Sequence, residues 1–401
     1  MRPPRVAFFP DSFHEVNGVA HTSRNFLAFA ERRDLPFLCV RAGGTAPRST
    51  PLEITGNLQT LELPRSGASI QMEKDLDFDP LFWRHAGLIH RALRAFQPDV
   101  IHITGPSELG IFGAYFAWKL GIPLAASWHT NVHEYAARRL AWLTAHLGHD
   151  AGGNLDRGIE HGALSATLWF YSLAKVLFAP NGELCEMLET ATHRPCHLMQ
   201  RGVDTQLFSP VHRTRPVDER PSAPFTLGFV GRLSVEKNVA LLPRIARKLA
   251  ATSPRPIRFL IVGQGAEQEA LARELPGAKF AGVLRGHALA EAYANMDLLV
   301  FPSHTDTFGN VVLEALASGV PAIVTPDGGP KYIIQEGKTG HIVADEQFSG
   351  AIEGLIENPI RLARMRLASR AYAQTCTWDA VFDRIYEAYK TLPAPISADH
   401  S

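Results

Sequence analysis

Short apolar runs alternate with longer stretches of helical periodicity along nearly the whole chain of 401 residues. This alternation is typical of βαβ units, in which helices connect parallel strands and cover both faces of a sheet. In the first half the runs predict strands at Arg5–Pro10, Leu35–Val40, Asp99–Thr104, Pro123–Ser127 and Lys175–Pro180. In the second half they predict strands in FTLGFVG, IRFLIVG, AKFAGV, DLLVFPS and PAIVT. We therefore expect an α/β protein with two parallel sheets.

A segment rich in proline and charge separates the two halves. Ser209–Pro224 (SPVHRTRPVDERPSAP) has no apolar periodicity, as expected of a linker. We predict a Rossmann-like acceptor domain at 1–208, the linker at 209–224 and a second Rossmann-like domain at 225–376. The tail 377–401 contains WDAVFDRIYEAYK, an amphipathic pattern that predicts a helix able to pack back on the first domain. Because doubly wound sheets bind ligands at the carboxyl ends of their strands, we expect a cleft between the two sheets.

The charge balance and the cysteine pattern argue against several classes of protein. Lys and Arg number 40, as do Asp and Glu, so the net charge does not suggest a nucleic-acid partner. The four cysteines form no CxxC pair, which argues against a disulfide framework or a zinc site and favours a reducing compartment. The amino terminus runs directly into a strand, and no stretch reaches the roughly 20 apolar residues of a spanning helix. We expect a cytoplasmic protein that can rest on the inner face of the cell membrane.

Two cations follow the first predicted strand of the second half. In GFVGRLSVEKN, Arg232 and Lys237 lie between a glycine turn and a helix start. Cations beside the amides that open a helix can bind phosphate oxygens. Two solvated surface cations with no ligand would give the same sequence pattern. The position at a strand end favours the phosphate site.

Two further positions lie after strands in the first half. Gly18, in PDSFHEVNGVAHTSRNF, would let the backbone approach an anionic ligand closely, although the GxGxxG dinucleotide fingerprint is missing. His129, in SWHTN, lies just past a strand end, where a ligand contact competes with an ordinary structural role. His129 and His133 do not form HExxH, and no third ligand is apparent. We therefore predict no metal site.

A pair of carboxylates brackets a predicted helix start in SHTDTFGNVVLEALASGV. Asp306 precedes the helix, and Glu314 lies among apolar residues within it. Burying a carboxylate in such a run is costly unless another group hydrogen-bonds it. Glu314 therefore needs a polar partner.

The combination of these segments resembles the large family of retaining nucleotide-sugar glycosyltransferases with the GT-B fold. The matching pieces of the second half are GFVGRLSVEKN, FAGVLRGHALAEAYANMDLLVFPS, DTFGNVVLEALASGVPAIVT and GGPKYIIQEGKTGHIV. In the first half they are VNGVAHT, SWHTN and RGVD (Arg201 to Asp204). The resemblance covers nearly the whole chain and is most specific in the second half. It implies two Rossmann-like domains facing a cleft, and transfer of a hexose from a UDP- or GDP-linked donor to a lipid or saccharide acceptor.

The resemblance also implies roles for particular residues. Arg232 and Lys237 would hold the donor diphosphate. Asp306 would contact hydroxyls of the transferred sugar, Glu314 would hold the ribose hydroxyls, and His129 would contact the sugar near its anomeric carbon. The other implied donor contacts are Gly18, Val283, Leu284, Phe308, Gly309, Asn310 and Val311.

The chemistry of such a transfer suits those residue types. Breaking the sugar–phosphate bond leaves an oxocarbenium-like sugar and a diphosphate anion. Fixed cations and helix amides stabilise that anion without a metal or another cofactor. In this family the departing phosphate is thought to accept the acceptor's proton on the same face of the sugar, so we assign no protein base.

Three positions depart from the family pattern. Asp306 stands where glutamate is usual, Tyr332 stands where many relatives have the glutamate of GGxxE, and RGVD replaces NGVD. The sequences DTFGNVVLEA and RGVD are most similar to those of family members that glycosylate lipids, including mannosyl- and sulfoquinovosyltransferases. His133–Leu147 has the basic and aromatic pattern of a membrane-surface helix, although an ordinary surface helix has the same pattern. LSATLWFYSLA could line an acceptor groove or belong to the core.

Two other functions remain open at this stage. A phosphorylase or epimerase relative could share the fold, but no pattern singles out the Schiff-base lysine of a pyridoxal enzyme. A non-catalytic sugar-nucleotide or carbohydrate-binding protein could also share it. The presence of Arg232, Lys237 and His129 together favours the transferase.

Overall fold

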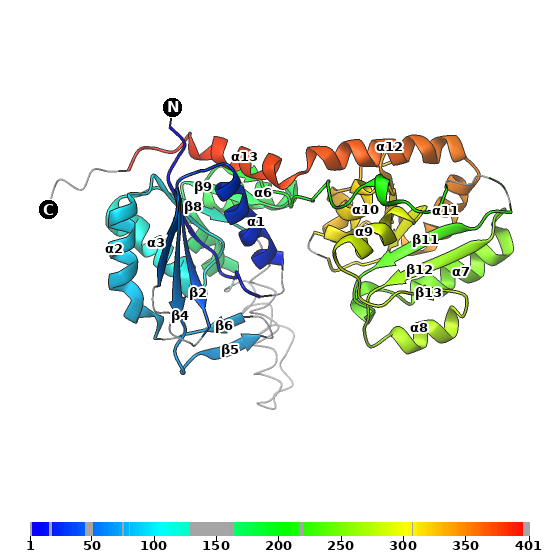
Figure 1. The fold of residues 1–401 in the computed structure, drawn as a ribbon, viewed down its shortest axis with the longest axis horizontal. Coiled ribbons are helices and arrows are strands. Elements are labelled where there is room, and N and C mark those ends of the chain that lie inside the picture. Colours follow the sequence, from blue (N-terminus) through cyan, green and yellow to red (C-terminus); the bar gives the residue numbers. More distant parts are fainter. Residues whose placement is uncertain are drawn as a thin grey trace. The chain divides into compact units, whose positions relative to one another are not determined.

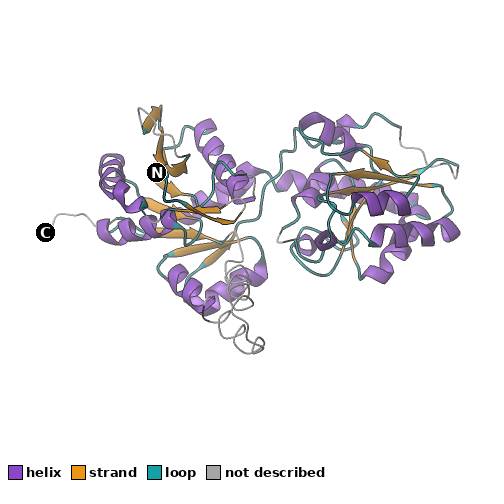
Figure 2. Ribbon diagram, turned by 90° about the horizontal axis from the view of Figure 1, so that it is seen from below, coloured by secondary structure: helices purple, strands orange, loops and turns teal. Residues whose placement is uncertain are grey.

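The computed structural model describes residues 2–15, 18–44, 51–73, 76–79, 81–128, 162, 164–216, 220, 222–306 and 308–395. The chain divides into two compact units. One consists of Met1–Gln200 with Val381–Ser401, and the other of Arg201–Ala380. Each unit has its own parallel sheet with helices on both faces (Figures 1 and 2).

The first unit contains an eight-stranded sheet in the order β10-β9-β8-β7-β1-β2-β4-β3. Its strands are β1 (Val6–Phe9), β2 (Phe37–Gly43), β3 (Leu52–Thr55), β4 (Leu58–Pro64), β7 (Val100–Ile103), β8 (Leu124–Ser127), β9 (Val176–Ala179) and β10 (Cys196–Leu198). All neighbours pair in parallel except β3 and β4. A separate two-stranded sheet joins β5 (Ile70–Glu73) and β6 (Leu76–Phe78). The five strands predicted for this half are confirmed.

Helices cover both faces of this sheet because successive side chains of each buried strand point to opposite faces. The helical elements are α1 (Gly18–Arg32), η1 (Phe82–His85), α2 (Ala86–Phe96), α3 (Glu108–Leu120), residues 164–172, and α6 (Gly182–Thr192). On one face Phe9 belongs to the same core cluster as Leu93 of α2 and Phe116 of α3. On the other, Phe8 packs edge-on against Phe26 of α1 at 5.2 Å.

The predicted C-terminal helix is α13 (Trp378–Tyr389), and its residues from Val381 onward belong to the first unit. The Phe382 ring stacks on Phe26 of α1 with centroids 4.5 Å apart. The Tyr389 hydroxyl hydrogen-bonds to Nδ1 of the buried His102 on β7, whose Nε2 lies 2.9 Å from Ser127 Oγ. The helix is therefore fixed to the sheet by an aromatic stack and a buried polar chain.

Replacing either of two tyrosines of α13 by phenylalanine should affect stability differently. Tyr389→Phe leaves a ring nitrogen of His102 buried without its partner, so we expect it to lower the free energy of unfolding by about 1–3 kcal/mol. Tyr386→Phe is the matched control, because the Tyr386 hydroxyl is buried without a hydrogen-bond partner among the described residues. It should leave the urea midpoint unchanged or raise it. Equal losses in both variants would contradict the role of the His102 contact.

The second unit contains a six-stranded, fully parallel sheet in the order β13-β12-β11-β14-β15-β16. Its strands are β11 (Phe225–Val230), β12 (Ile257–Val262), β13 (Lys279–Phe280), β14 (Leu298–Phe301), β15 (Ala322–Val324) and β16 (Gly340–Ile342). Numbered within the unit, this order is 3-2-1-4-5-6, the doubly wound Rossmann arrangement. Its strand order reverses between β11 and β14. The predicted α/β fold class and all five predicted strands of this half are confirmed.

The helices of the second unit connect these strands. They are α7 (Leu241–Thr252), α8 (Gln268–Glu274), α9 (Gly286–Ala294), α10 (Asn310–Ala317), α11 (Phe348–Ile356) and α12 (Pro359–Thr375). Short 3-10 turns are η2 (Pro210–His212), η3 (Val235–Lys237), η4 (Pro330–Tyr332) and η5 (Asp345–Gln347). In the part of the chain that the structure describes, no helix combines the length and apolarity needed to cross a bilayer.

The boundary between the units differs from the predicted one. It falls between Gln200 and Arg201, before the proline-rich segment that we expected to be the linker. That segment packs on the second unit, because Arg213 donates to Asp297 at 2.8 Å and Arg215 also pairs with this carboxylate. Asp297 lies just before β14 and is 4% exposed. The arginines that suggested a solvated linker therefore neutralise the buried Asp297 carboxylate.

Candidate active site

The predicted donor residues of the second unit lie at the carboxyl edge of its sheet. Residues 231–238 follow β11, and residues 302–309 follow β14. These are the two strands between which the strand order reverses, and ligands of doubly wound sheets bind at that point. Lys237 and Asp306 thus come from neighbouring loops although they are far apart in the sequence.

Close backbone contacts shape the β11 loop. Gly263 has a φ of +129°, and a Cβ there would overlap the carbonyl oxygen of Gly231. A Cβ at Gly265 would likewise overlap the carbonyl oxygen of Leu233. The amide of Leu233 donates to Gln264 O at 3.0 Å. These two glycines belong to the GQG sequence Gly263–Gly265, which is too short to indicate a ligand site by itself. Their contacts fix the turn that carries Arg232.

Lys237 and Asp306 form an ion pair in this structure. Lys237 Nζ lies 2.6 Å from Asp306 Oδ1, and both side chains are about one-fifth exposed. Thr305 Oγ1 also donates to the carbonyl of Glu236 at 3.3 Å, which ties the two loops together. The other oxygen, Asp306 Oδ2, is buried without a hydrogen-bond partner among the described residues. The lysine predicted for phosphate and the acid predicted for sugar hydroxyls therefore occupy one site.

Arg201, from RGVD, is a site residue whose importance the sequence did not reveal. Burial lowers its pKa to about 10, and the nearby Asp306 carboxylate opposes that change by stabilising the charged guanidinium. The guanidinium carbon lies 5.7 Å from the centre of the Phe308 ring, within the range of a cation–π contact. Asp306 thus interacts with two cations, Lys237 and Arg201. The feature of the sequence that could have identified Arg201 is the replacement of NGVD by RGVD.

The start of α10 offers amides to an anion. Gly309 is its N-cap in a left-handed conformation with a φ of +86°, and as a glycine it has no side chain to cap the first turn. The N–H groups that open the helix, at Asn310 and Val311, are therefore available to a ligand. Phe308, beside them, is 5% exposed and belongs to the core.

The glycine pair after β15 holds this loop in place. The amide of Gly329 donates to the carbonyl of Asp306 at 2.6 Å. Gly328 has a φ of +70°, and a Cβ there would lie 2.7 Å from the same carbonyl oxygen. Tyr332 lies at the end of the 3-10 turn that follows. The glycines of the GGP segment thus support the backbone beside the acid.

Glu314 has the polar partner that its apolar helix demands. The hydroxyl of Tyr293, on α9, donates to Glu314 Oε2 at 2.8 Å. Burial raises the pKa of Glu314 to about 7, and the tyrosine hydrogen bond limits the rise. Tyr293 is fully buried, and burial together with the carboxylate raises the pKa of its hydroxyl well above 10. The acid can therefore change its charge near neutral pH.

The remaining predicted contacts differ in their surroundings. The Arg232 side chain is exposed and makes no hydrogen bond or ion pair within the described ranges, so its guanidinium is available to a ligand. Val283 is 52% exposed, and Leu284 packs partly on the core. Both follow β13, in a loop whose Gly282 carbonyl accepts from Gly263. The loops that follow β11, β12 and β13 thus lie side by side along the carboxyl edge of the second sheet.

The residues predicted in the first half belong to the first unit or lie outside the described residues. Gly18 opens α1 in the first unit, where its carbonyl accepts from Thr22 Oγ1 at 2.9 Å. His129, His133 and the basic segment to Leu147 lie outside the described residues. LSATLWFYSLA divides between core and surface, since Phe170 and Tyr171 are buried whereas Trp169 is 66% exposed.

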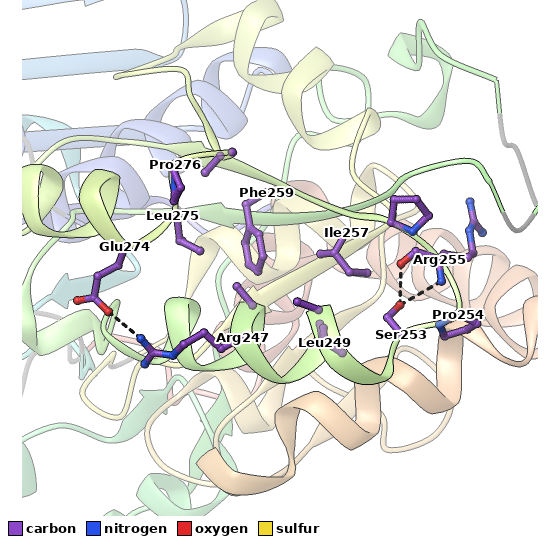
Figure 3. Close-up of a pocket in the computed structure, with 15 residues that line it drawn as sticks. Arg247, Leu249, Ser253, Pro254, Arg255, Ile257, Phe259, Glu274, Leu275 and Pro276 are labelled. Atoms are coloured by element: carbon purple, nitrogen blue, oxygen red, sulfur yellow. Dashed lines mark hydrogen bonds and ion pairs between the residues drawn. The ribbon is translucent and has the colours of Figure 1, made fainter.

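A separate pocket of about 560 Å³ lies elsewhere in the second unit (Figure 3). Leu249, Ile257, Phe259 and Leu275 form its apolar lining, and the Arg247–Glu274 ion pair of 3.4 Å spans its rim. Ile257 is the first residue of β12, so this pocket borders the amino end of the strand rather than the carboxyl edge. It contains none of the predicted donor residues.

The fold and the carboxyl-edge cluster define the nucleotide-sugar glycosyltransferases of the GT-B class. The family model described as "Glycosyltransferase Family 4" matches residues 16–207, and the one described as "Glycosyl transferases group 1" matches residues 224–358. The chain therefore belongs to these group 1, family 4 glycosyltransferases.

Individual relatives agree with that assignment. The chain is 33% identical to a GDP-mannose-dependent alpha-mannosyltransferase of Mycobacterium tuberculosis, over 97% of each protein. It is 30% identical to the sulfoquinovosyl transferase SQD2 of Arabidopsis thaliana, over 85% of this chain and 64% of that one. Its fold matches sucrose-phosphate synthase from Thermosynechococcus elongatus with a TM-score of 0.67, 17% identity, and coverage of 97% and 98%. The predicted resemblance to the GT-B family is confirmed.

Proposed function

We propose that this protein is a retaining, metal-independent hexosyltransferase that takes mannose from GDP-mannose and transfers it to a lipid or saccharide acceptor at the cytoplasmic face of the membrane. The observation that carries the proposal is the convergence of Lys237, Asp306 and the start of α10 at the point where the strand order of the second sheet reverses. The mannosyltransferase relative, similar over 97% of its length, supports this donor over a UDP-sugar.

The charges of the site suit the departure of a diphosphate. In the free site Lys237 is neutralised by Asp306, while Arg232 is free within the described ranges. A donor diphosphate would bind Arg232 and Lys237 and the amides that open α10, and its sugar hydroxyls would donate to Asp306. As the sugar–phosphate bond breaks, negative charge would grow on the diphosphate, and these donors would stabilise it. The leaving oxygen would then accept the acceptor's proton.

The donor can be identified by a ligand screen on the full chain. We expect GDP and GDP-mannose to raise the unfolding temperature more than UDP or UDP-sugars, since a ligand at a hundred times its Kd adds about 2.7 kcal/mol. The best donor is then offered lipid and sugar acceptors with EDTA present, and the anomeric configuration of the product is read by NMR. An inverted product would contradict the retaining mechanism. Donor binding without turnover on any acceptor would favour a binding protein.

The shorter acid at position 306 predicts a change in donor preference. Asp306→Glu adds one methylene and moves the carboxylate relative to Lys237 and Arg201. We expect the ratio of kcat/KM values between donors with different sugars to change several-fold, with the Kd of free GDP altered less than twofold. The two quantities are measured on the same panel of GDP- and UDP-sugars. An unchanged donor profile would remove Asp306 from the sugar contact.

A further inference from the structure

Helix α3 of the first unit is apolar on both of its faces. Its inward residues, which include Leu109, Phe112 and Phe116, are buried in the core. At the spacing i, i+4, i+7 on the outward side stand Ile111, Tyr115 and Trp118, of which Ile111 is 41% and Trp118 80% exposed. A helix that is apolar all round is normally buried. The outward side of α3 therefore has the composition of a covered surface.

The exposed apolar residues form one continuous patch. Trp83, which is 54% exposed, places its ring 4.4 Å from Phe112 and 5.9 Å from Tyr115. The Tyr115 ring lies 6.2 Å from Trp118. Leu81, beside Trp83 at the start of η1, is 55% exposed. We call Leu81, Trp83, Ile111, Tyr115 and Trp118 the aromatic face.

The surroundings of the aromatic face are cationic. Residues 81–98 and 109–127, which contain η1, α2 and all of α3 except its first residue, include no aspartate or glutamate. That first residue, Glu108, is buried and pairs with Arg65 at 3.3 Å. Arg91 and Arg94 are exposed on α2, and their side chains make no hydrogen bond or ion pair with described residues. Lys119 Nζ lies 5.6 Å from the centre of the Tyr115 ring. Helices α2 and α3 are neighbours, since His90 stacks on Phe116 at 5.9 Å (Figure 1).

We propose that the aromatic face binds the surface of an anionic phospholipid bilayer. Tryptophan and tyrosine favour the boundary between headgroups and acyl chains, because each has an apolar ring and a polar N–H or O–H. Flanking arginine and lysine side chains gain from the negative potential of anionic lipids. The charges of Arg91, Arg94 and Lys119 therefore complement an anionic surface. The membrane thus covers α2 and α3, and this contact does not depend on the proposed donor or acceptor.

Sedimentation of the full chain with vesicles tests the proposal. We expect binding to vesicles in which about a third of the lipid is phosphatidylglycerol, with little binding to phosphatidylcholine alone. Trp83→Ser combined with Trp118→Glu should lower the partition coefficient on anionic vesicles roughly tenfold or more. Arg91→Gln combined with Arg94→Gln should lower it by a similar factor and weaken its dependence on salt.

The controls separate membrane contact from damage to the fold. Ile54→Glu places the same new charge on β3, where the residue is 62% exposed, and should leave binding unchanged. Urea midpoints of all variants are measured alongside, because Trp83 also packs on Phe112 and a loss of stability there must be separated from a loss of vesicle binding. Vesicle binding that is insensitive to the tryptophan pair, or a dimer that this pair dissociates, would overturn the proposal. GDP binding is measured in parallel without lipid, so failure of the donor assignment would be recognised separately.

Discussion

Replacing Arg232 and Lys237 together by alanine is expected to lower kcat/KM for the donor by roughly a hundred- to ten-thousand-fold. Each cation should contribute about 1.5–3 kcal/mol through charge-assisted hydrogen bonds to the diphosphate, and the contributions increase as the leaving group becomes more negative. Because the bond-breaking state carries more charge than the bound donor, kcat should fall in addition to any rise in KM. Steady-state transfer and single-turnover donor cleavage measure the two parameters.

A matched control removes the same charges from another surface of the same unit. Arg247→Ala with Lys248→Ala takes two exposed cations from α7, at the pocket of Figure 3, away from the carboxyl edge. This pair should leave kcat/KM within about twofold, as is usual for surface substitutions away from a site. If the Arg232–Lys237 variant behaved like this control, the diphosphate would have to bind elsewhere. If both variants lost activity, the loss would reflect a general change in the unit.

Nucleotide affinity should depend on the ionisation of Glu314. Its pKa of about 7 means that the carboxylate, the better acceptor of ribose hydroxyls, becomes the main form only above neutral pH. We expect GDP to bind more tightly as the pH rises from 6 to 8. Glu314→Gln should weaken GDP binding by roughly tenfold at pH 8 and remove the pH dependence. A deoxyribose analogue that lacks the relevant hydroxyl should bind both proteins alike, and calorimetry across the pH range measures each case.

The same raised pKa has the opposite consequence for stability. In the unfolded chain the Glu314 carboxyl would titrate near 4.5, so between that pH and 7 the folded protein holds a proton that the unfolded chain has released. Its contribution to stability is complete below about pH 4.5 and is lost as the pH rises through 7. Glu314→Gln, which keeps the neutral shape, should therefore unfold at a higher urea concentration than the wild type at pH 8. A lower midpoint at that pH would show that the carboxylate itself holds the helix.

Periodicity predicted the strands that are buried on both faces. Runs such as VAFF in β1 and LLVF in β14 are apolar without interruption, which parallel sheets require. It missed β3 and β4, whose sequences LEIT and LQTLELP mix polar and apolar residues at one edge of the sheet. It also missed β16, which has three residues and contains a glycine and a histidine. Short strands and edge strands depend more on pairing with neighbouring strands than on their own amino-acid sequence.

The site shows a similar division. Glycine turns and strand ends predicted where Lys237 and Asp306 stand, and the apolar run around Glu314 predicted that this acid needs a polar partner. The direct pairing of Lys237 with Asp306 was not predicted, because it depends on two loops that are 69 residues apart in the sequence. Tyr293 was missed as the partner of Glu314, because a tyrosine in an alanine-rich helix gives no sign of where its hydroxyl points. Such pairings depend on how α9 and α10 pack.

The place of α13 makes the second unit an insertion within the first. Residues 201–380 form one continuous stretch, whereas the first unit is assembled from two stretches at opposite ends of the chain. The first unit is therefore complete only when Phe382 packs on Phe26 and Tyr389 reaches His102. Until α13 docks, buried aromatic side chains of the first unit are open to solvent, so the docking of this helix limits the time during which the folding chain is prone to aggregate.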